Sequence, residues 1–265
     1  MLPDPLHPTE LTNSEVKESF PHFYNLYSTL PRMLSKKRIL AAVDQNEDIN
    51  SNRVYIYKDL KFEIPPGVFE PSKTSEVIFD KLYDGTIQVS GARYLVMGAG
   101  AGVEAVIASK KDAKMIYALD IHRGSVEATK QIFRHLIPYG GSQLYVRESN
   151  LFENLPSGLH VDVITFNPPG VSIPISDNPD VVRVTSIGTT ILTRFFYELQ
   201  SKKVLDQNGE AFVMLTNSSE LRKIISFALL NGLAPSILEV FFDKSRYQYY
   251  QTFLFKFTLM PDDWK

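Results

Sequence analysis

The sequence predicts an α/β protein: a doubly wound, mainly parallel sheet of seven strands with an antiparallel C-terminal edge, and a small helical cap at the N-terminus. Two observations predict the sheet. From Gly91 onward, short apolar runs alternate with helical stretches, and after Gly232 two such runs follow each other without a helix. Strands that alternate with helices lie parallel through right-handed crossovers, whereas strands in direct succession pair antiparallel.

The N-terminal residues carry shorter and less regular patterns. Residues 14–27 and 30–44 have the apolar spacing of short amphipathic helices, and Pro21 interrupts the first of them. Residues 72–83 have similar spacing, and Ser72 at the start of this stretch is a favoured N-cap. These segments predict helices ahead of the sheet.

A cluster of two prolines and a glycine at residues 65–67 marks the expected domain boundary. We expect residues 1–64 to form the cap and part of the substrate region, and residues 65–265 to form the main domain. The 44% hydrophobic content of the 265-residue chain is enough for such a domain to have its own core.

The regular part of the chain is assigned from its apolar runs and their spacing. The strand candidates are residues 94–97, 115–119, 143–147, 161–166, 211–216, 237–242 and 252–259. Helices are expected at residues 103–109, 123–137, 185–204 and 219–231.

Composition excludes several classes of function. The chain has no cysteine, so disulfides and thiolate metal sites are excluded, and its five histidines lack the spacing of metal ligands. The N-terminus has no apolar stretch like that of a signal peptide, and no segment has the roughly 20 apolar residues of a membrane span. We therefore expect a cytoplasmic protein without a metal site. A net charge of −2 argues mildly against a nucleic-acid partner, although a local basic groove is compatible with it.

The turn after the first strand carries three glycines, Gly98, Gly100 and Gly102. Glycine tolerates positive φ and lets backbone N–H groups come into contact with a ligand, so this turn predicts a nucleotide or nucleoside site. A tight strand-to-helix turn without a ligand is the alternative. The dinucleotide fingerprint needs a glycine three residues after Gly100, where this chain has Val103, so nicotinamide binding is disfavoured.

Polar residues follow the next three strands. Asp120 ends the second strand, about where an acid accepts hydrogen bonds from a ribose in such folds. Asn150 follows the third and could bind an adenine amine, or could cap the loop. The fourth strand ends in Asn167-Pro168-Pro169-Gly170. Because ligands in open α/β sheets bind at the carboxyl ends of strands, we expect one site at this edge.

The glycine turn, the acid, Ser149-Asn150-Leu151-Phe152 and Asn167-Pro168-Pro169 together resemble the class I S-adenosylmethionine-dependent methyltransferases. They most resemble the NPPY branch, which includes the release-factor glutamine methyltransferases, their small-domain RNA relatives and adenine DNA methyltransferases. Residues 65–82 are similar to the segment before the glycine turn in the release-factor and RNA enzymes. The resemblance covers roughly residues 65–216 and implies a Rossmann-like sheet with S-adenosylmethionine as cofactor and S-adenosylhomocysteine as product.

The resemblance also implies residue roles. The cofactor would contact Gly98, Ala99, Gly100, Gly102, Asp120, Ile121, Asn150, Leu151 and Asn167. The catalytic pair would be Asn167 and Pro168, whose side-chain and main-chain oxygens accept hydrogen bonds from a planar nitrogen and orient its lone pair toward the methyl group. Rigid prolines hold such acceptors still, and positioning is most of what methyl transfer requires. A strand-ending turn with a structural role only is the alternative.

Two positions depart from the family pattern. Asn150 stands where the family usually has aspartate, and an amide oxygen can still accept from an amine. Gly170 stands where a tyrosine or phenylalanine stacks on the planar target. Phe69 or one of Tyr247, Tyr249 and Tyr250 could supply that ring; alternatively, a bulkier substrate uses the room beside Pro169 and Gly170.

These departures favour methyl transfer to an amine or amide nitrogen of a small-molecule or peptide-like substrate. A release-factor glutamine or an RNA base is the alternative acceptor. A fold that binds the cofactor as a regulator or scaffold, without transfer, is a third interpretation. Lys73, Thr74 and Ser75 could contact the methionine carboxylate of the cofactor or could cap their helix.

Overall fold

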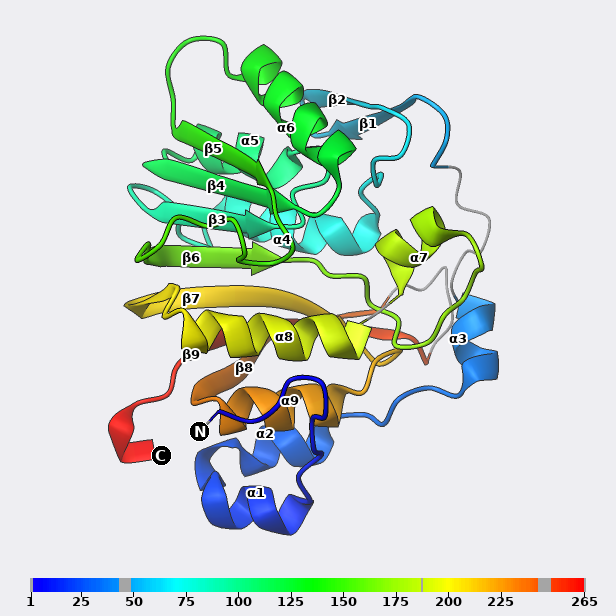
Figure 1. The fold of residues 1–265 in the computed structure, drawn as a ribbon, viewed down its shortest axis with the longest axis vertical. Coiled ribbons are helices and arrows are strands. Elements are labelled where there is room, and N and C mark those ends of the chain that lie inside the picture. Colours follow the sequence, from blue (N-terminus) through cyan, green and yellow to red (C-terminus); the bar gives the residue numbers. More distant parts are fainter. Residues whose placement is uncertain (1, 43–48, 187, 243–248, 265) are drawn as a thin grey trace. The chain divides into compact units, whose positions relative to one another are not determined.

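The computed structural model describes residues 2–42, 49–186, 188–242 and 249–264 (Figure 1). The chain divides into two compact units. We call Asn46–Asn167 the inner unit, because it lies in the sequence between the two segments of the other, and we call Met1–Gln45 with Pro168–Lys265 the outer unit. The sheet has seven strands in the order β5-β4-β3-β6-β7-β9-β8, which confirms the predicted fold class.

The inner unit contains the parallel strands. They are β3 (Arg93–Met97), β4 (Met115–Asp120), β5 (Gln143–Glu148) and β6 (Val161–Phe166), with helices α4 (Lys73–Asp84), α5 (Val103–Lys110) and α6 (Arg123–Leu136). β3 pairs in parallel with both β4 and β6, and β4 pairs in parallel with β5. Helix α5 packs against α4 and α6 (Figure 1). All of these elements begin and end within a few residues of the predicted positions.

The parallel strands β3 and β6 are fixed to one another where both begin. The Arg93 guanidinium donates to both carboxylate oxygens of Asp162, at 2.6 and 3.1 Å, and the Arg93 backbone N–H donates to the same carboxylate at 2.7 Å. The hydrogen bonds from Arg93 hold the pKa of Asp162 below its usual value. This bidentate pair favours the observed register, in which Tyr94 lies opposite Val163.

A two-stranded hairpin was not predicted. β1 (Arg53–Tyr57) and β2 (Leu60–Ile64) form a separate antiparallel sheet joined at Lys58, which has φ 51°. Burial alternates residue by residue along both strands. The sequence of β2 alternates between apolar and polar residues. The sequence of β1 does not, because Val54 and Ile56 on its exposed face are apolar.

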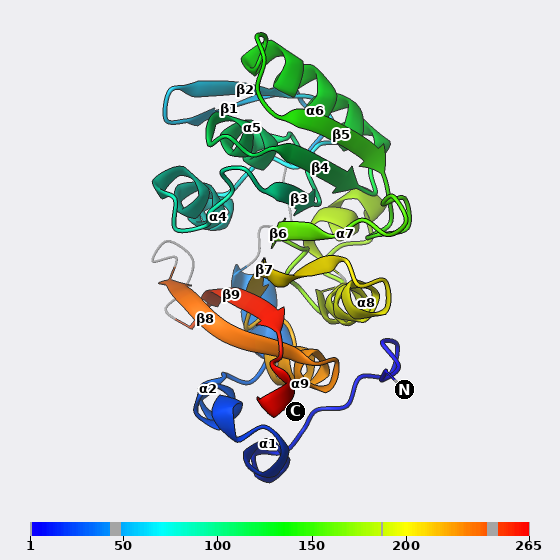
Figure 2. The same cartoon turned by 90° about the vertical axis from the view of Figure 1, so that its left-hand side faces the viewer.

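The outer unit contains the antiparallel edge. Its strands are β7 (Leu205–Thr216), β8 (Leu233–Phe242) and β9 (Gln251–Leu259), and β9 pairs antiparallel with both of the others. Its helices are α1 (Asn13–Ser19), α2 (Tyr24–Thr29), α3 (Lys36–Ala42), α7 (Pro179–Thr185), α8 (Gly188–Ser201) and α9 (Leu221–Leu230), with short 3₁₀ turns η1 (Pro21–Phe23) and η2 (Asp262–Trp264). Helices α8 and α9 pack together beside the three strands (Figure 2).

Helical predictions in the outer unit were correct in type and too long in extent. The predicted helix 30–44 begins only at Lys36, after the non-helical Pro31. The predicted helix 185–204 is α8 alone, and α7 precedes it as a separate helix with Asn178 as its N-cap. In the described part of the chain, no helix is long and apolar enough to cross a membrane.

A buried carboxyl group lies in the core of the inner unit. Glu104 of α5 accepts hydrogen bonds from the hydroxyls of Tyr94 on β3, at 2.9 Å, and of Thr165 on β6. All three residues are buried, and burial raises the pKa of Glu104 to about 7. The Glu104 side chain therefore ties the helix after the glycine turn to two strands of the sheet.

We predict that Glu104 makes folding stability depend on pH. Its pKa is higher in the folded state than in the unfolded chain, so its contribution is complete below about pH 4.5 and is lost as the pH rises through about 7. The difference corresponds to roughly 3 kcal/mol. Urea unfolding of the wild type and Glu104→Gln at pH 5, 6, 7 and 8 should show a smaller pH dependence in the variant. Equal pH dependence in both proteins would contradict this role.

Candidate functional site

The register of the parallel strands places four strand ends in one row. Met97 at the end of β3 lies opposite Leu119 of β4 and Phe166 of β6, and Asp120 lies opposite Glu148 of β5. The residues that follow these positions therefore share one edge of the inner unit. The order of the strands reverses at β3, between β4 and β6, which is where open α/β sheets bind ligands.

All three glycines of the turn have left-handed backbone conformations, with φ 71° at Gly98, 55° at Gly100 and 76° at Gly102. Their surroundings differ. A Cβ atom at Gly102 would lie 3.1 Å from the Cα of Thr129 in α6, so this glycine permits close packing of α5 on α6. A Cβ atom at Gly100 would have no atom within 4 Å. The backbone at Gly100 is therefore the part of the turn that a ligand could approach.

Asp120 links the end of β4 to the glycine turn. One carboxylate oxygen accepts from the Gly100 backbone N–H at 2.9 Å, and the other accepts from the His122 backbone N–H at 2.8 Å. Each carboxylate oxygen can accept more than one hydrogen bond, so these contacts orient Asp120 and leave it able to accept from hydroxyls. Ile121, the next residue, is 55% exposed. An exposed apolar side chain at this place could cover an aromatic ring.

The loop after β5 is built around Ser149. The Ser149 backbone N–H donates to the Asp120 carbonyl at 2.8 Å, and the Ser149 hydroxyl donates to the Leu151 carbonyl at 2.7 Å. Leu151 is buried and has φ 52°. The amide nitrogen of Asn150 donates to Glu153 at 3.1 Å. The hydrogen bond from Ser149 thus brings the loop that contains Asn150 and Leu151 next to Asp120. Contact of these two residues with the cofactor stays a prediction.

Asn167 is oriented by Ser75 of α4. The Asn167 amide nitrogen donates to the Ser75 hydroxyl oxygen at 3.1 Å, and the Ser72 backbone N–H donates to the same oxygen at 3.2 Å. With Nδ2 engaged in this way, Oδ1 is the free acceptor of the side chain, since no donor among the described residues reaches it. The amide therefore presents an acceptor at the end of β6.

The role of Ser75 was not predicted in this form, because 92 residues separate it from Asn167 and no local pattern joins them. The other residues of that turn have separate contacts: the Thr74 and Ser72 hydroxyls lie 2.7 Å apart, and Lys73 forms an ion pair with Glu76 at 2.8 Å. Contact of this turn with a methionine carboxylate stays a prediction.

The boundary between the two compact units falls after Asn167, so Pro168, Pro169 and Gly170 belong to the outer unit. There, the Gly170 carbonyl accepts from the hydroxyls of Thr216 and Ser218, at 3.0 and 2.8 Å. A Cβ atom at Gly170 would lie 3.3 Å from the Cγ2 atom of Thr216. Packing against Thr216 is therefore a reason for glycine at this position that does not depend on a substrate.

The aromatic residues considered as substitutes for the missing ring lie in different environments. Tyr250 is 6% exposed and its hydroxyl lies 3.2 Å from that of Ser218. Tyr249 is half-buried with the Arg38 guanidinium over its ring, and Phe69 is a half-buried residue of the inner unit. Tyr247 lies outside the described residues.

Comparisons with known proteins identify similar folds but no similar sequences. No model of a protein family matches the sequence, and no curated protein matches it. Solved structures do match. The ribosomal protein L11 methylase of Lactobacillus delbrueckii subsp. bulgaricus has a TM-score of 0.52 and 18% identity, over 75% of this chain and 84% of its own. The 16S rRNA N2 G1207 methyltransferase RsmC of T. thermophilus, solved with AdoMet and guanosine, has a TM-score of 0.55 and 17% identity, over 80% of this chain and 50% of its own.

A third similar structure is the E. cuniculi Mtq2–Trm112 complex, responsible for methylation of the eRF1 translation termination factor. It has a TM-score of 0.53 and 17% identity, over 73% of this chain and 99% of the matched chain. The protein therefore has the fold of the class I S-adenosylmethionine-dependent methyltransferases, which confirms the fold that the motifs implied.

The orientation of Asn167 can be tested without a substrate. We predict that one proton of its side-chain amide exchanges slowly in the wild type, because it donates to Ser75. Ser75→Ala should speed its exchange at least tenfold, whereas Thr74→Ala, which removes a hydroxyl from the same turn, should not. Nitrogen–proton NMR measures this, with the signal assigned by its absence in Asn167→Asp. The same exchange rate in Ser75→Ala and the wild type would contradict the assigned contact.

Proposed function

We propose that the protein is an S-adenosylmethionine-dependent methyltransferase that acts on a nitrogen of an amine or amide. The observation that carries this proposal is the orientation of Asn167, whose Nδ2 is held by Ser75 while Oδ1 is left as an acceptor at the end of β6. A turn with a structural role only has no need for an oriented acceptor that no donor among the described residues reaches. An acceptor there can bind the N–H of a substrate.

The residues at the strand ends fit S-adenosylmethionine. A Cβ atom would meet nothing at Gly100, so a ligand can approach the turn, and the neighbouring Asp120 carboxylate can accept from ribose hydroxyls. We assign Gly98, Ala99, Gly100, Gly102, Asp120, Ile121, Asn150, Leu151 and Asn167 to the cofactor. The bound cofactor supplies a methyl group that is already activated on a sulfonium.

The chain itself contributes orientation. Asn167 Oδ1 and the Pro168 carbonyl would each accept an N–H from the substrate nitrogen, so that its lone pair points at the methyl group. The two prolines restrict the backbone that carries these acceptors. The proton released from the nitrogen can pass to water, so no histidine or carboxylate base is required. Phe69, Pro169 and Gly170 are assigned to the substrate.

Two classes of substrate could carry the nitrogen that is methylated. A small-molecule or peptide-like substrate was inferred from room at Gly170, but Thr216 crowds that position. A protein glutamine or an RNA base is the other class; the similar structures named above include enzymes that act on rRNA and on a translation termination factor. The predicted cap at residues 1–64 and a cytoplasmic location stay proposals from the sequence.

Asn167→Ala tests the proposed role of the acceptor. Labelled S-adenosylmethionine is incubated with the protein and with the RNA, protein and small-molecule fractions of a strain that lacks the gene, and the fraction that gains label identifies the substrate class. Asn167→Ala should then lower turnover about 10²–10³-fold, as loss of a transition-state contact does. S-adenosylhomocysteine affinity should fall by a much smaller factor, because the other residues assigned to the cofactor are intact.

The matched control is Asn208→Ala, an exposed asparagine on β7, which should transfer methyl at the wild-type rate. Loss of cofactor affinity and turnover by equal factors in Asn167→Ala would contradict the acceptor role. Label in no fraction from the wild type would contradict the proposed function as a whole.

A further inference from the structure

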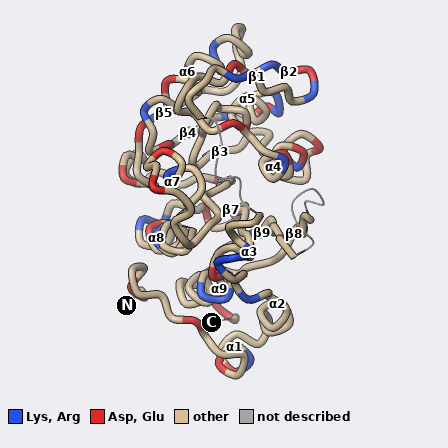
Figure 3. The backbone as a smooth tube through the Cα atoms, turned by 90° about the vertical axis from the view of Figure 1, so that its right-hand side faces the viewer, with Lys and Arg blue, Asp and Glu red and all other residues tan. Residues whose placement is uncertain are grey.

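Helix α3 and the turn before it are rich in basic residues. Residues 30–42 contain four basic side chains, Arg32, Lys36, Lys37 and Arg38, and no acidic one. All four are exposed, and none forms an ion pair with an acidic residue in the described part of the chain. Figure 3 shows the blue colour of basic residues on the backbone of α3. We call these four residues the basic strip. Lys202, Lys223 and Lys256, which also belong to the outer unit, each form an ion pair with a glutamate within 3.0 Å.

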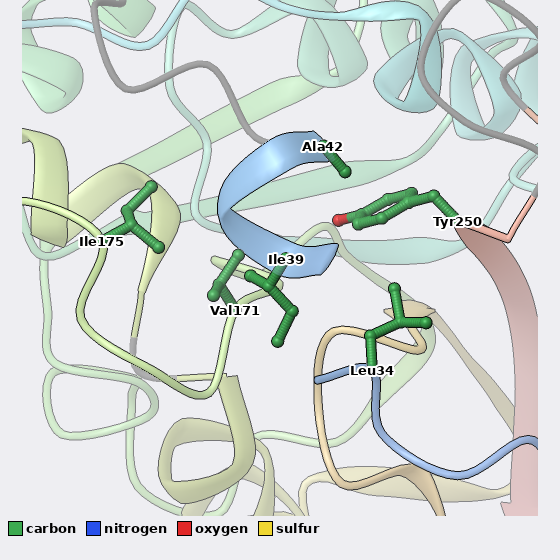
Figure 4. Close-up of a cluster of buried hydrophobic side chains, with 6 residues drawn as sticks. All are labelled: Leu34, Ile39, Ala42, Val171, Ile175 and Tyr250. Atoms are coloured by element: carbon green, nitrogen blue, oxygen red, sulfur yellow. The ribbon is translucent and has the colours of Figure 1, made fainter. Parts of the chain in front are cut away.

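The apolar side of the same helix is anchored on the segment that follows the motif. Ile39 and Ala42 of α3, with Leu34, are buried in one cluster with Val171, Ile175 and Tyr250 (Figure 4). Val171 is the residue after Gly170. The helix that carries the basic strip is therefore packed directly on the continuation of Asn167-Pro168-Pro169-Gly170.

Hydrogen bonds strengthen this anchor. The Leu34 backbone N–H, between Arg32 and Lys36, donates to the Asn217 carbonyl at 2.9 Å. The residues on either side of Asn217 are Thr216 and Ser218, whose hydroxyls donate to the Gly170 carbonyl. Residues 216–218 therefore bind both Gly170 and Leu34, and all of these residues belong to the outer unit.

The ring of Tyr249 lies beside one residue of the basic strip. The Arg38 guanidinium carbon lies 4.8 Å from the ring centre of Tyr249, and the Asn217 side-chain amide donates to the Tyr249 carbonyl at 2.7 Å. A guanidinium over an aromatic ring presents a flat, cationic surface, and such surfaces stack on bases and contact phosphates. Cations beside an aromatic ring favour a nucleic acid over a segment of acidic residues, because the carboxylates of Asp and Glu carry no aromatic ring that could stack.

We propose that the basic strip binds the phosphodiester backbone of a nucleic acid and brings a base to the acceptor site beside Pro168–Gly170. The net charge of −2, which argued mildly against nucleic acid, averages over the chain and conceals this local surface. Delivery of a base rests on the proposed methyltransferase function, whereas binding of the backbone does not.

The test is the affinity of the full chain, saturated with S-adenosylhomocysteine, for fluorescent 12-nucleotide RNA and DNA strands at 50–300 mM KCl. Each phosphate contact should add about 0.7 to the slope of log affinity against log salt, so four contacts give roughly 3. Lys36→Glu/Lys37→Glu should weaken binding at least tenfold and lower the slope by about 1.4. Tighter binding of RNA would identify it as the source of the backbone, and tighter binding of DNA would identify DNA.

The control is Lys110→Glu/Arg134→Glu, which makes the same change in net charge at exposed, unpaired positions on α5 and α6. It should bind as the wild type does. Equal loss in the two double variants would overturn the proposal, because net charge alone would explain it. No binding at 50 mM KCl, or binding of polyglutamate as tight as that of RNA, would also overturn it.

The proposal and the proposed function fail in distinguishable ways. Calorimetry with S-adenosylhomocysteine should give the same affinity for Lys36→Glu/Lys37→Glu and the wild type. Strip-dependent nucleic-acid binding without methyl transfer to any fraction would refute the proposed function and leave the surface assigned. Methyl transfer to a small amide without nucleic-acid binding would refute the surface alone.

Discussion

The arrangement of the site depends on the pairing of β3 with a parallel neighbour on each side. Because Met97 lies opposite both Leu119 and Phe166, the residues that follow them, 98, 120 and 167, lie at the same edge of the sheet. The bidentate contact of Arg93 with Asp162 fixes this register at the other end of the strands. A slip of one residue would turn every side chain of β3 to the opposite face and separate the strand ends.

The strand ends are then held by hydrogen bonds between loops. Asp120 accepts from Gly100, its carbonyl accepts from Ser149, and Asn167 donates to Ser75. Each contact joins segments that are at least 20 residues apart in the sequence. In Asn167 the amide nitrogen is engaged, and no donor among the described residues reaches Oδ1. Such a site is preorganised, because the polar groups that would orient a ligand are already held in place.

Local pattern explains what the sequence could predict. From Gly91 onward, the alternation of apolar runs with helical stretches predicted the type and order of the strands and helices. The polar residues that follow each strand predicted the candidate site. Both predictions need only residues that are neighbours in the sequence. The hydrogen bond between Asn167 and Ser75 and the close approach of Thr216 to Gly170 are tertiary contacts. They join residues far apart in the sequence, so a local sequence pattern cannot predict them. The hairpin at 53–64 was not predicted, because the exposed positions Val54 and Ile56 of β1 are apolar and the strand therefore lacks the alternation of a half-buried strand.

Calorimetric titration with S-adenosylhomocysteine tests the central claim most directly, namely that the row of strand ends binds this cofactor. The account predicts a dissociation constant on the order of micromolar, and at least tenfold weaker binding by Asp120→Asn, which loses a charged acceptor for the ribose. The unfolding temperature of the variant must show that it is folded. No heat of binding from the wild-type protein, or unchanged affinity in folded Asp120→Asn, would contradict the account.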